Sequence, residues 1–267
     1  MLARCCVAAV AVAILTPAVA RADDAEPTTW EQLFFPFPIV GAPPQLEQQV
    51  QVFDTYSHGD RGGADVTSAE LAYIASPHVG IVATIPYQFG GAEQATGLED
   101  IQLLGQYLAA GSLADDAMLS IGVEATLPTG HNTLGQGDAF VGPFAYAAKR
   151  WRHRFVLEGD LTVLIPLADD ASTQEILGTA MAAVMLTPRH FDAPIYAQVE
   201  LDSTTYVDGP PDTLFVAPEI FVGPFASPIN DGTRIAAGVS FELAGDPVHR
   251  QTYMLTAAFD IPNKYGY

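Results

Sequence analysis

Hydrophobic and polar residues alternate along much of this chain, most regularly over residues 117–127. Every odd-numbered position in that segment is apolar, and the even-numbered positions include Ser120, Glu124 and Thr126. A period of two predicts a β-strand with one apolar and one polar face. The segment is longer than an average globular strand and matches the length that a strand tilted across a bilayer needs.

Similar segments, separated by clusters of turn-forming residues, follow through the rest of the chain. The predicted strands are 45–57, 68–75, 79–89, 98–109, 117–127, 139–148, 155–165, 176–186, 194–202, 213–222, 234–243 and 252–261. Three segments close on Pro86, Pro128 and Pro166, about one strand pair apart, so these prolines are expected at the same rim. The even number of strands is what a single-chain bacterial barrel requires.

Three of these segments also carry helix signals. Residues 172–175 and 67–70 have the form of capping boxes, and 98–110 has acids early and a glycine after its end. The local residues leave helix and strand open in each case. We predict strands, because a sheet without these segments would keep unpaired edges.

The first 44 residues differ from the rest. Residues 1–22 combine a cationic start, an apolar run too short to span a bilayer and small residues at Ala20 and Ala22. They predict a cleaved signal peptide, with a retained anchor or a buried helix as the alternative. Residues 23–44 are rich in proline and aromatics and form either a plug or a loose lead-in. The barrel is predicted over residues 45–267.

Composition supports export and a membrane location. The chain carries a formal net charge of −20, which argues against nucleic acid as a partner, yet it is 49% hydrophobic and so is not an acidic disordered chain. Cys5 and Cys6 lie in the predicted signal, so the mature chain would have no disulfide and no cysteine-ligated metal. No later apolar run is long enough for a transmembrane helix, which leaves a closed barrel as the way to span a bilayer.

Acidic residues keep one phase along the predicted strands, opposite the apolar positions. The residues predicted to line the lumen are Asp100, Gln102, Gln106, Glu124, Glu158, Asp160, Glu200, Asp202, Glu219 and Glu242. A secreted soluble β-sandwich that binds a ligand would show the same alternation.

Two features favour the barrel over the sandwich. Aromatic residues near strand ends would form girdles at the membrane interfaces. They are Tyr87, Phe89, Tyr107, Phe140, Phe144, Tyr146, Trp151 and Phe155. The basic residues that follow the predicted signal stand in turns or at strand ends, so the polar face is expected to be acidic only.

No motif indicates catalysis, a cofactor or a metal. The histidines are scattered without the spacing of a zinc helix, and the acid pairs at 115–116 and 169–170 lack the rest of an EF-hand. Residues 135–138 are not followed by a helix or the P-loop lysine, and no serine stands in a nucleophile elbow. The basic run 149–154 is either a solvated turn or a contact for anionic lipid head groups.

Short motifs in the middle of the chain resemble the outer-membrane barrel family named for the meta-pathway of phenol degradation. They are Gly97-Leu98-Glu99-Asp100-Ile101, Gly105-Gln106-Tyr107, Leu127-Pro128-Thr129-Gly130 and Leu134-Gly135-Gln136-Gly137. The rest of the chain is similar only in its rhythm of strands. The resemblance implies an outer-membrane barrel proposed to pass small, often aromatic or hydrophobic compounds, and it supplies no catalytic residue.

We therefore expect an all-β, closed antiparallel transmembrane barrel of about twelve strands in the outer membrane of a Gram-negative bacterium. It would act as a passive channel, with lipid, small solutes and the barrel-assembly machinery as partners. Tyr265 and Tyr267 give the terminal aromatic of a barrel, although Pro262 interrupts the last strand. A structural barrel that does not conduct is the alternative within the same class.

The apolar faces predict where the protein is found in the cell. It should stay in the outer-membrane fraction through a carbonate wash, and it should migrate differently in a gel when it is not boiled. Recovery in the soluble periplasm would contradict the barrel.

Overall fold

The computed structural model describes residues 36, 46, 48–59, 62–89, 95–112, 115–130, 134–135, 137–152, 154–168, 173–187, 193–207, 209–225, 232–245 and 251–261. Its strands are β1 (Gln49–Gly59), β2 (Gly62–Ser76), β3 (Val79–Phe89), β4 (Gly97–Leu98), β5 (Ile101–Ser112), β6 (Ala117–Leu127), β7 (Phe140–Trp151), β8 (Phe155–Pro166), β9 (Glu175–Met185), β10 (Ile195–Tyr206), β11 (Thr213–Phe225), β12 (Thr233–Ala244) and β13 (Gln251–Asp260). Within these described ranges, no helix is long and apolar enough to cross a bilayer.

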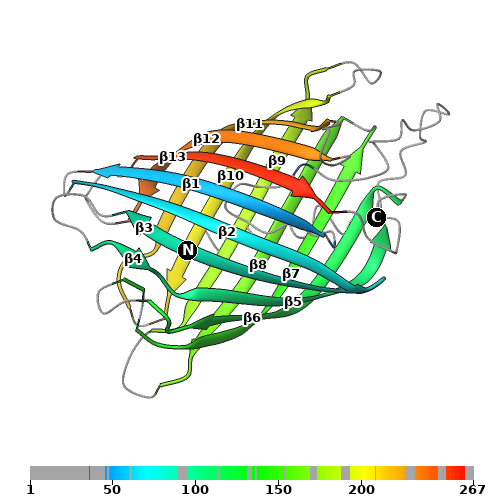
Figure 1. Cartoon of the computed structure of the whole chain (residues 1–267). Helices are drawn as coiled ribbons and strands as arrows, with labels where there is room; N and C mark the ends of the chain where they lie inside the picture. Colours follow the sequence, from blue (N-terminus) through cyan, green and yellow to red (C-terminus); the bar gives the residue numbers. More distant parts are fainter. Residues whose placement is uncertain are drawn as a thin grey trace.

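The strands form one antiparallel sheet that closes on itself (Figure 1). Each long strand pairs with the long strands before and after it in the chain, and β1 pairs with β13 to complete the ring. The two-residue strand β4 is an addition to β3. Twelve long strands therefore make a closed up-and-down barrel, which confirms the predicted fold and excludes the sandwich.

All three segments with helix signals are strands. Residues 67–70 lie inside β2, residues 98–110 fall mostly in β5, and Glu175, the last residue of the box at 172–175, is the first residue of β9. β9 pairs with β8 on one side and β10 on the other along nearly its whole length. Ladders on both edges outweigh a helical preference that amounts to tenths of a kcal/mol per residue.

The two ends of the barrel differ. Strand β1 begins and β13 ends at one end, here called the terminal end, where short connections follow β2, β5 and β7 and longer ones follow β9 and β11. At the opposite end, here called the loop end, a short connection follows β1, and the longest connections of the barrel follow β3 and β6. Pro86, Pro128 and Pro166 all lie at the loop end, as predicted.

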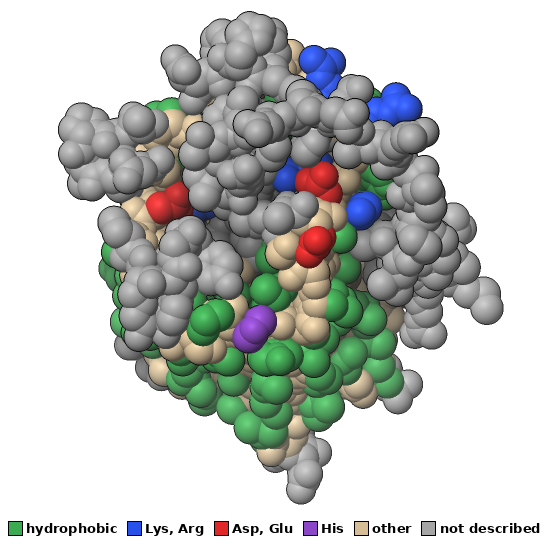
Figure 2. Space-filling model, turned by 90° about the vertical axis from the view of Figure 1, so that its right-hand side faces the viewer, with side chains coloured by type: hydrophobic (Ala, Val, Ile, Leu, Met, Phe, Trp, Pro, Cys, Tyr) green, Lys and Arg blue, Asp and Glu red, His purple; other side chains and the backbone are tan. Residues whose placement is uncertain are grey.

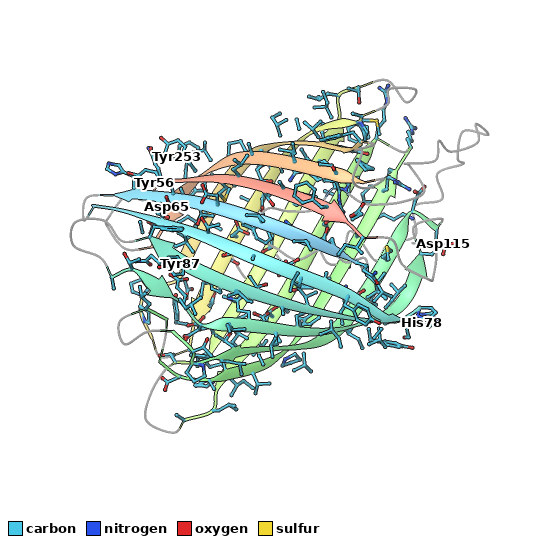
Figure 3. The ribbon with its side chains drawn as sticks, in the orientation of Figure 1. Tyr56, Asp65, His78, Tyr87, Asp115 and Tyr253 are labelled. Carbon is cyan, nitrogen blue, oxygen red and sulfur yellow. The ribbon has the colours of Figure 1, made fainter. Side chains whose placement is uncertain are left out.

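The outer surface is largely apolar. Strand β6 illustrates the phase: Ile121 and Val123 are 46% and 53% exposed, whereas Ser120 is fully buried in the interior. Tyr56, Tyr87 and Tyr253 lie at the loop end (Figure 3), and Tyr107 lies at the terminal end beside His78. Such aromatic positions near both ends are typical of membrane interfaces.

Three residues assigned to the girdles lie inside the barrel instead. Phe140, Phe144 and Tyr146 are no more than 5% exposed, and the last two stack with ring centroids 4.5 Å apart. They share one parity on β7, whose outward positions are mostly small residues. Gly122 makes room for this stack, because a Cβ there would come within 2.4 Å of the Phe144 ring.

On the described strands, two acids break the rule that acids face inward. Asp54 and Asp65 lie on the outer face of β1 and β2, opposite Thr67 and Tyr56 respectively. The Thr67 hydroxyl donates to Asp54 Oδ1 at 2.7 Å. Figure 3 places Asp65 near Tyr56 at the loop end, close to the aromatic girdle. Carboxyl groups on the lipid-facing side destabilise a barrel less near the membrane interface than at the centre of the bilayer.

The phase of β6 gives a testable contrast between neighbouring residues. Val123→Arg, which turns a cation toward the lipid, should lower the free energy of unfolding by about 2–4 kcal/mol, whereas Glu124→Arg, on the inner face, should cost much less. Urea unfolding in lipid vesicles measures both. Gly122→Arg is not a suitable inner control, because its Cβ would lie 2.0 Å from the Gly105 carbonyl oxygen. Equal damage from the two substitutions would show that the phase is wrong.

Candidate functional site: the barrel interior

The interior wall formed by β8, β9 and β10 carries carboxylates in two adjoining rows. In one row Glu158 and Glu200 flank Met181 across the strands. In the next row toward the loop end, Asp160 and Asp202 flank Thr179. Cross-strand neighbours on one face are about 5 Å apart at Cβ, so this wall concentrates negative groups.

Two of these groups converge with a residue of β11. The carboxyl of Glu200 contacts those of both Asp202 and Glu219, and these three side chains are here called the carboxyl cluster. Gln198 Nε2 donates to Glu219 Oε2 at 2.5 Å, and the Thr179 hydroxyl donates to Asp202 Oδ1 at 3.1 Å. The remaining oxygens, Asp202 Oδ2 and Glu219 Oε1, are buried without a hydrogen-bond partner.

The other predicted lining residues are spread around the ring. Gln102 and Gln106 share the inner parity of β5, with Gln106 buried and Gln102 exposed, and Glu124 is half-buried on β6. Glu242 on β12 lies opposite Phe215 of β11. Four strand steps around the ring separate Glu124 from the carboxyl cluster on β10, but its charge acts on Asp160, which lies in the same row as Asp202.

Asp100 belongs to the loop-end connections instead of a strand face. It precedes β5 and is 6% exposed, and its Oδ1 accepts a hydrogen bond of 2.8 Å from the Gly130 amide. A Cβ on Gly135, whose φ is +87°, would come within 2.5 Å of the Asp100 carboxyl. The Gly-x-x-Asp-Ile, Leu-Pro-Thr-Gly and Gly-Gln-Gly motifs therefore meet around one carboxylate. The Asp100 carboxylate therefore holds the start of the connection after β6 in place through the Gly130 amide.

Two arginines on the inner face were not predicted. Arg150 of β7 and Arg234 of β12 stand at strand ends, as expected, but they are only 4% and 2% exposed and point inward. Arg150 pairs with Asp116 at 2.6 Å, and Arg234 pairs with Asp260. Both lie at the terminal end, so the expectation of an acidic-only inner face is wrong there. Figure 2 views this end and shows basic and acidic side chains intermixed.

Arg234 belongs to a chain of buried polar side chains, here called the seam network, that joins β12, β13 and β1. Arg234 donates to Gln49 at 2.5 Å, Gln49 donates to Gln51 at 3.0 Å, and Gln51 donates to Thr256 at 2.9 Å. The Thr256 hydroxyl in turn donates to the Val52 carbonyl at 3.2 Å. These bonds cross the junction between the first and last strands from the inside.

Aromatic side chains flank the carboxyl cluster and were also missed. Tyr196 and Phe221 pack edge to face at 6.1 Å on the terminal side, and Phe215 lies opposite Asp202 on the loop side. They share the inner parity of β10 and β11 with the acids. That parity is the sequence signal that could have identified these aromatic residues as inward-facing, because a residue two positions from an inward acid on a strand must also face inward.

Among the described residues, no group of three or more His, Cys, Asp or Glu side chains is arranged to hold a metal ion. The predicted signal and nearly all of residues 23–44 lie outside the described ranges, so both assignments stay predictions. Pro36, the one described residue of that segment, is buried. Leu46 is buried against the inward side of Gly80, so the chain reaches β1 from inside the barrel.

Similarity to known proteins is found at the level of structure. No protein-family model and no curated protein sequence matches the chain. An outer membrane channel from Pseudomonas putida F1 superposes with a TM-score of 0.60 at 12% identity, over 85% of this chain and 99% of that one. The NanC porin gives 0.57 at 11% identity, over 79% and 100% of the two chains. The KdgM porin gives 0.53 at 7%, over 80% and 99%.

These neighbours are outer-membrane channels and porins, and the chain shares the fold of that class of barrel. Identities this low carry no residue-level correspondence. The narrower assignment to the family of the phenol meta-pathway stays a prediction.

The seam network predicts a specific loss of stability. Arg234→Met removes charge-assisted hydrogen bonds to Gln49 and Asp260, so the free energy of unfolding should fall by roughly 1.5–3 kcal/mol. Urea unfolding followed by the unboiled gel shift measures it. Arg154→Met, in the exposed turn after β7, is the matched control and should change little. Equal effects of the two substitutions would contradict a role for Arg234 at the seam.

Proposed function

We propose that the protein is a passive channel for small molecules in the outer membrane of a Gram-negative bacterium, and not an enzyme. The observation that carries the proposal is the opposite character of the two faces of one closed sheet. The outer face exposes large apolar residues, and the inner face holds carboxylates on β6, β8, β10, β11 and β12. An apolar exterior suits lipid, and a polar interior is what water-filled barrels have.

The orientation follows the usual rule for such barrels. Short turns face the periplasm and the longest connections face the outside, and the longest connections here follow β3 and β6 at the loop end. The terminal end is therefore assigned to the periplasm and the loop end to the exterior. The proposed partners are outer-membrane lipid, small solutes and, during insertion, the barrel-assembly machinery. The residues proposed to line the passage are Gln102, Gln106, Glu124, Glu158, Asp160, Glu200, Asp202, Glu219 and Glu242.

The charge of the interior supports selection by charge. Away from the two terminal-end arginines, the inward ionisable groups of the described strands are acids. Rings and walls of carboxylates favour cations over anions in channels. A passage of this kind would admit cations and neutral solutes, including uncharged aromatic compounds, and would disfavour benzoate-like anions. The KdgM porin is known in complex with oligogalacturonate, a carboxylate-bearing chain that this acidic interior does not suit.

A barrel that does not conduct is the second candidate, and one observation favours it. Interior side chains such as Ala148, Ala217 and Phe221 have no exposed surface, so part of the inside is filled. The buried Pro36 and Leu46 are consistent with a segment before β1 contributing to that filling.

Reversal potentials in planar bilayers under a salt gradient test the channel. The wild type should prefer cations, and Asp160→Asn/Asp202→Asn should weaken that preference, because two half-buried inward charges are removed without a change of size. The matched control is Asp54→Asn, which removes an outward acid and should leave the reversal potential unchanged.

Anion preference in the wild type would contradict the proposal. So would a lack of conductance in both the wild type and a variant that lacks residues 23–44. Conductance restored by that deletion would instead identify the segment as a plug.

A further inference from the structure

Two oxygen atoms in the carboxyl cluster of Glu200, Asp202 and Glu219 lack a hydrogen-bond donor. Glu219 is 4% exposed, and its Oε1 has no hydrogen-bond partner; Asp202 Oδ2 is likewise buried without one. A buried carboxylate oxygen without a donor is costly, because it has lost the hydrogen bonds that water would give it. Both oxygens belong to side chains that contact the same third carboxyl, Glu200.

The residues around the cluster add an apolar and aromatic component. On the terminal side, the rings of Tyr196 and Phe221 meet edge to face, with exposures of 1% and 0%. On the loop side, Phe215 lies directly opposite Asp202, and both are half-buried. Exposure therefore rises toward the loop end, so a ligand would reach the cluster from there and meet Phe215 first.

We infer that this part of the wall binds a small organic ammonium ion with an aromatic body. This inference rests on the proposed channel function and specifies the class of solute that the channel binds. An ammonium group offers three N–H donors, the kind of group that the two unpartnered oxygens lack, and its charge strengthens each bond. Aromatic faces attract cations and also pack against an aromatic ring, so Phe215 would contact the ligand's body.

The wall on the other side of the ring does not offer this combination. Strand β3, six strand steps from β10, turns Gly80, Val82, Thr84, Pro86 and Gln88 inward, none of which is charged. The inward acid nearest to that face, Glu70 of β2, accepts a hydrogen bond of 3.4 Å from the Thr84 hydroxyl of β3. The buried oxygens without a partner in the carboxyl cluster have no such donor.

Calorimetric titration of the folded, detergent-solubilised full chain tests the inference with three probes that share one aromatic body. They are phenethylammonium, phenethyl alcohol and phenylacetate, which carry a positive, a neutral and a negative head. Phenethylammonium should bind saturably in the presence of sodium chloride, the alcohol should bind roughly tenfold more weakly or not at all, and phenylacetate should not bind.

Two substitutions that preserve size locate the site. Glu219→Gln and Asp202→Asn should each weaken phenethylammonium binding by roughly tenfold, the effect of losing a hydrogen bond to a charged group. Glu70→Gln, which removes an inward acid on β2, is the matched control and should leave the affinity unchanged. Phe215→Leu should weaken phenethylammonium more than ethylammonium. The gel shift of unboiled protein checks that every variant is folded.

The inference is overturned if no probe binds, if the alcohol or phenylacetate binds as tightly as the ammonium, or if Glu219→Gln and Asp202→Asn bind as the wild type does. Cation-preferring conductance without ammonium binding would refute this site and leave the channel standing. Ammonium binding without any cation-preferring conductance would refute the channel and leave the site.

Discussion

Every backbone N–H and C=O group that faces hydrocarbon must find a partner within the protein, and this requirement determines the closed architecture of the barrel. The chain meets it by closing the sheet, and closure requires β1 to pair with β13. This ladder joins residues separated by almost the whole chain, so its loop-closure entropy is the largest of any strand pair. The seam network adds side-chain bonds at that junction, from Arg234 through the two glutamines to Thr256.

Closure divides the side chains of each strand between two solvents. Side chains at outward positions meet lipid and are mostly large and apolar. Polar side chains at inward positions must form hydrogen bonds with one another or with water. On the terminal half, arginines and acids are paired in the interior, as Arg150 is with Asp116. On the wall of β8 to β11 the acids outnumber the donors, which leaves the buried oxygens of Asp202 and Glu219 without partners. That local excess of acceptors is the feature from which the proposed ammonium site follows.

Much of the fold follows from the sequence because a strand has a period of two. Strands β3 and β6 have the predicted bounds, and the inward phase of Glu124, Glu158, Glu200 and Glu219 follows from the apolar positions beside them. Composition misled the assignment of Phe144 and Tyr146: aromatic type suggested a membrane girdle, whereas their parity on β7 places them inside. In the polar-rich β1, alternation was too weak to show that Asp54 faces outward.

The contacts between side chains on neighbouring strands could not be predicted from the sequence. Register decides that Gln198 of β10 meets Glu219 of β11 and that Phe215 lies opposite Asp202, and nothing in either strand alone specifies that alignment. The role of Asp100 also depends on a contact across the chain, since its carboxylate meets Gly130 of a separate connection. The Gly-x-x-Asp-Ile and Leu-Pro-Thr-Gly motifs, which in the sequence mark the start of one strand and the end of another, are therefore in contact in the structure.

The proposed channel requires that the outer face of the wall meets lipid and that the inner face meets water. Single spin labels placed in turn on residues 117–127 of the protein in lipid vesicles test it most directly, through their accessibility to oxygen and to a water-soluble nickel complex. Labels at odd-numbered positions should favour oxygen and labels at even-numbered positions should favour nickel, with a period of two. Equal accessibility on both faces, or the opposite phase, would contradict it.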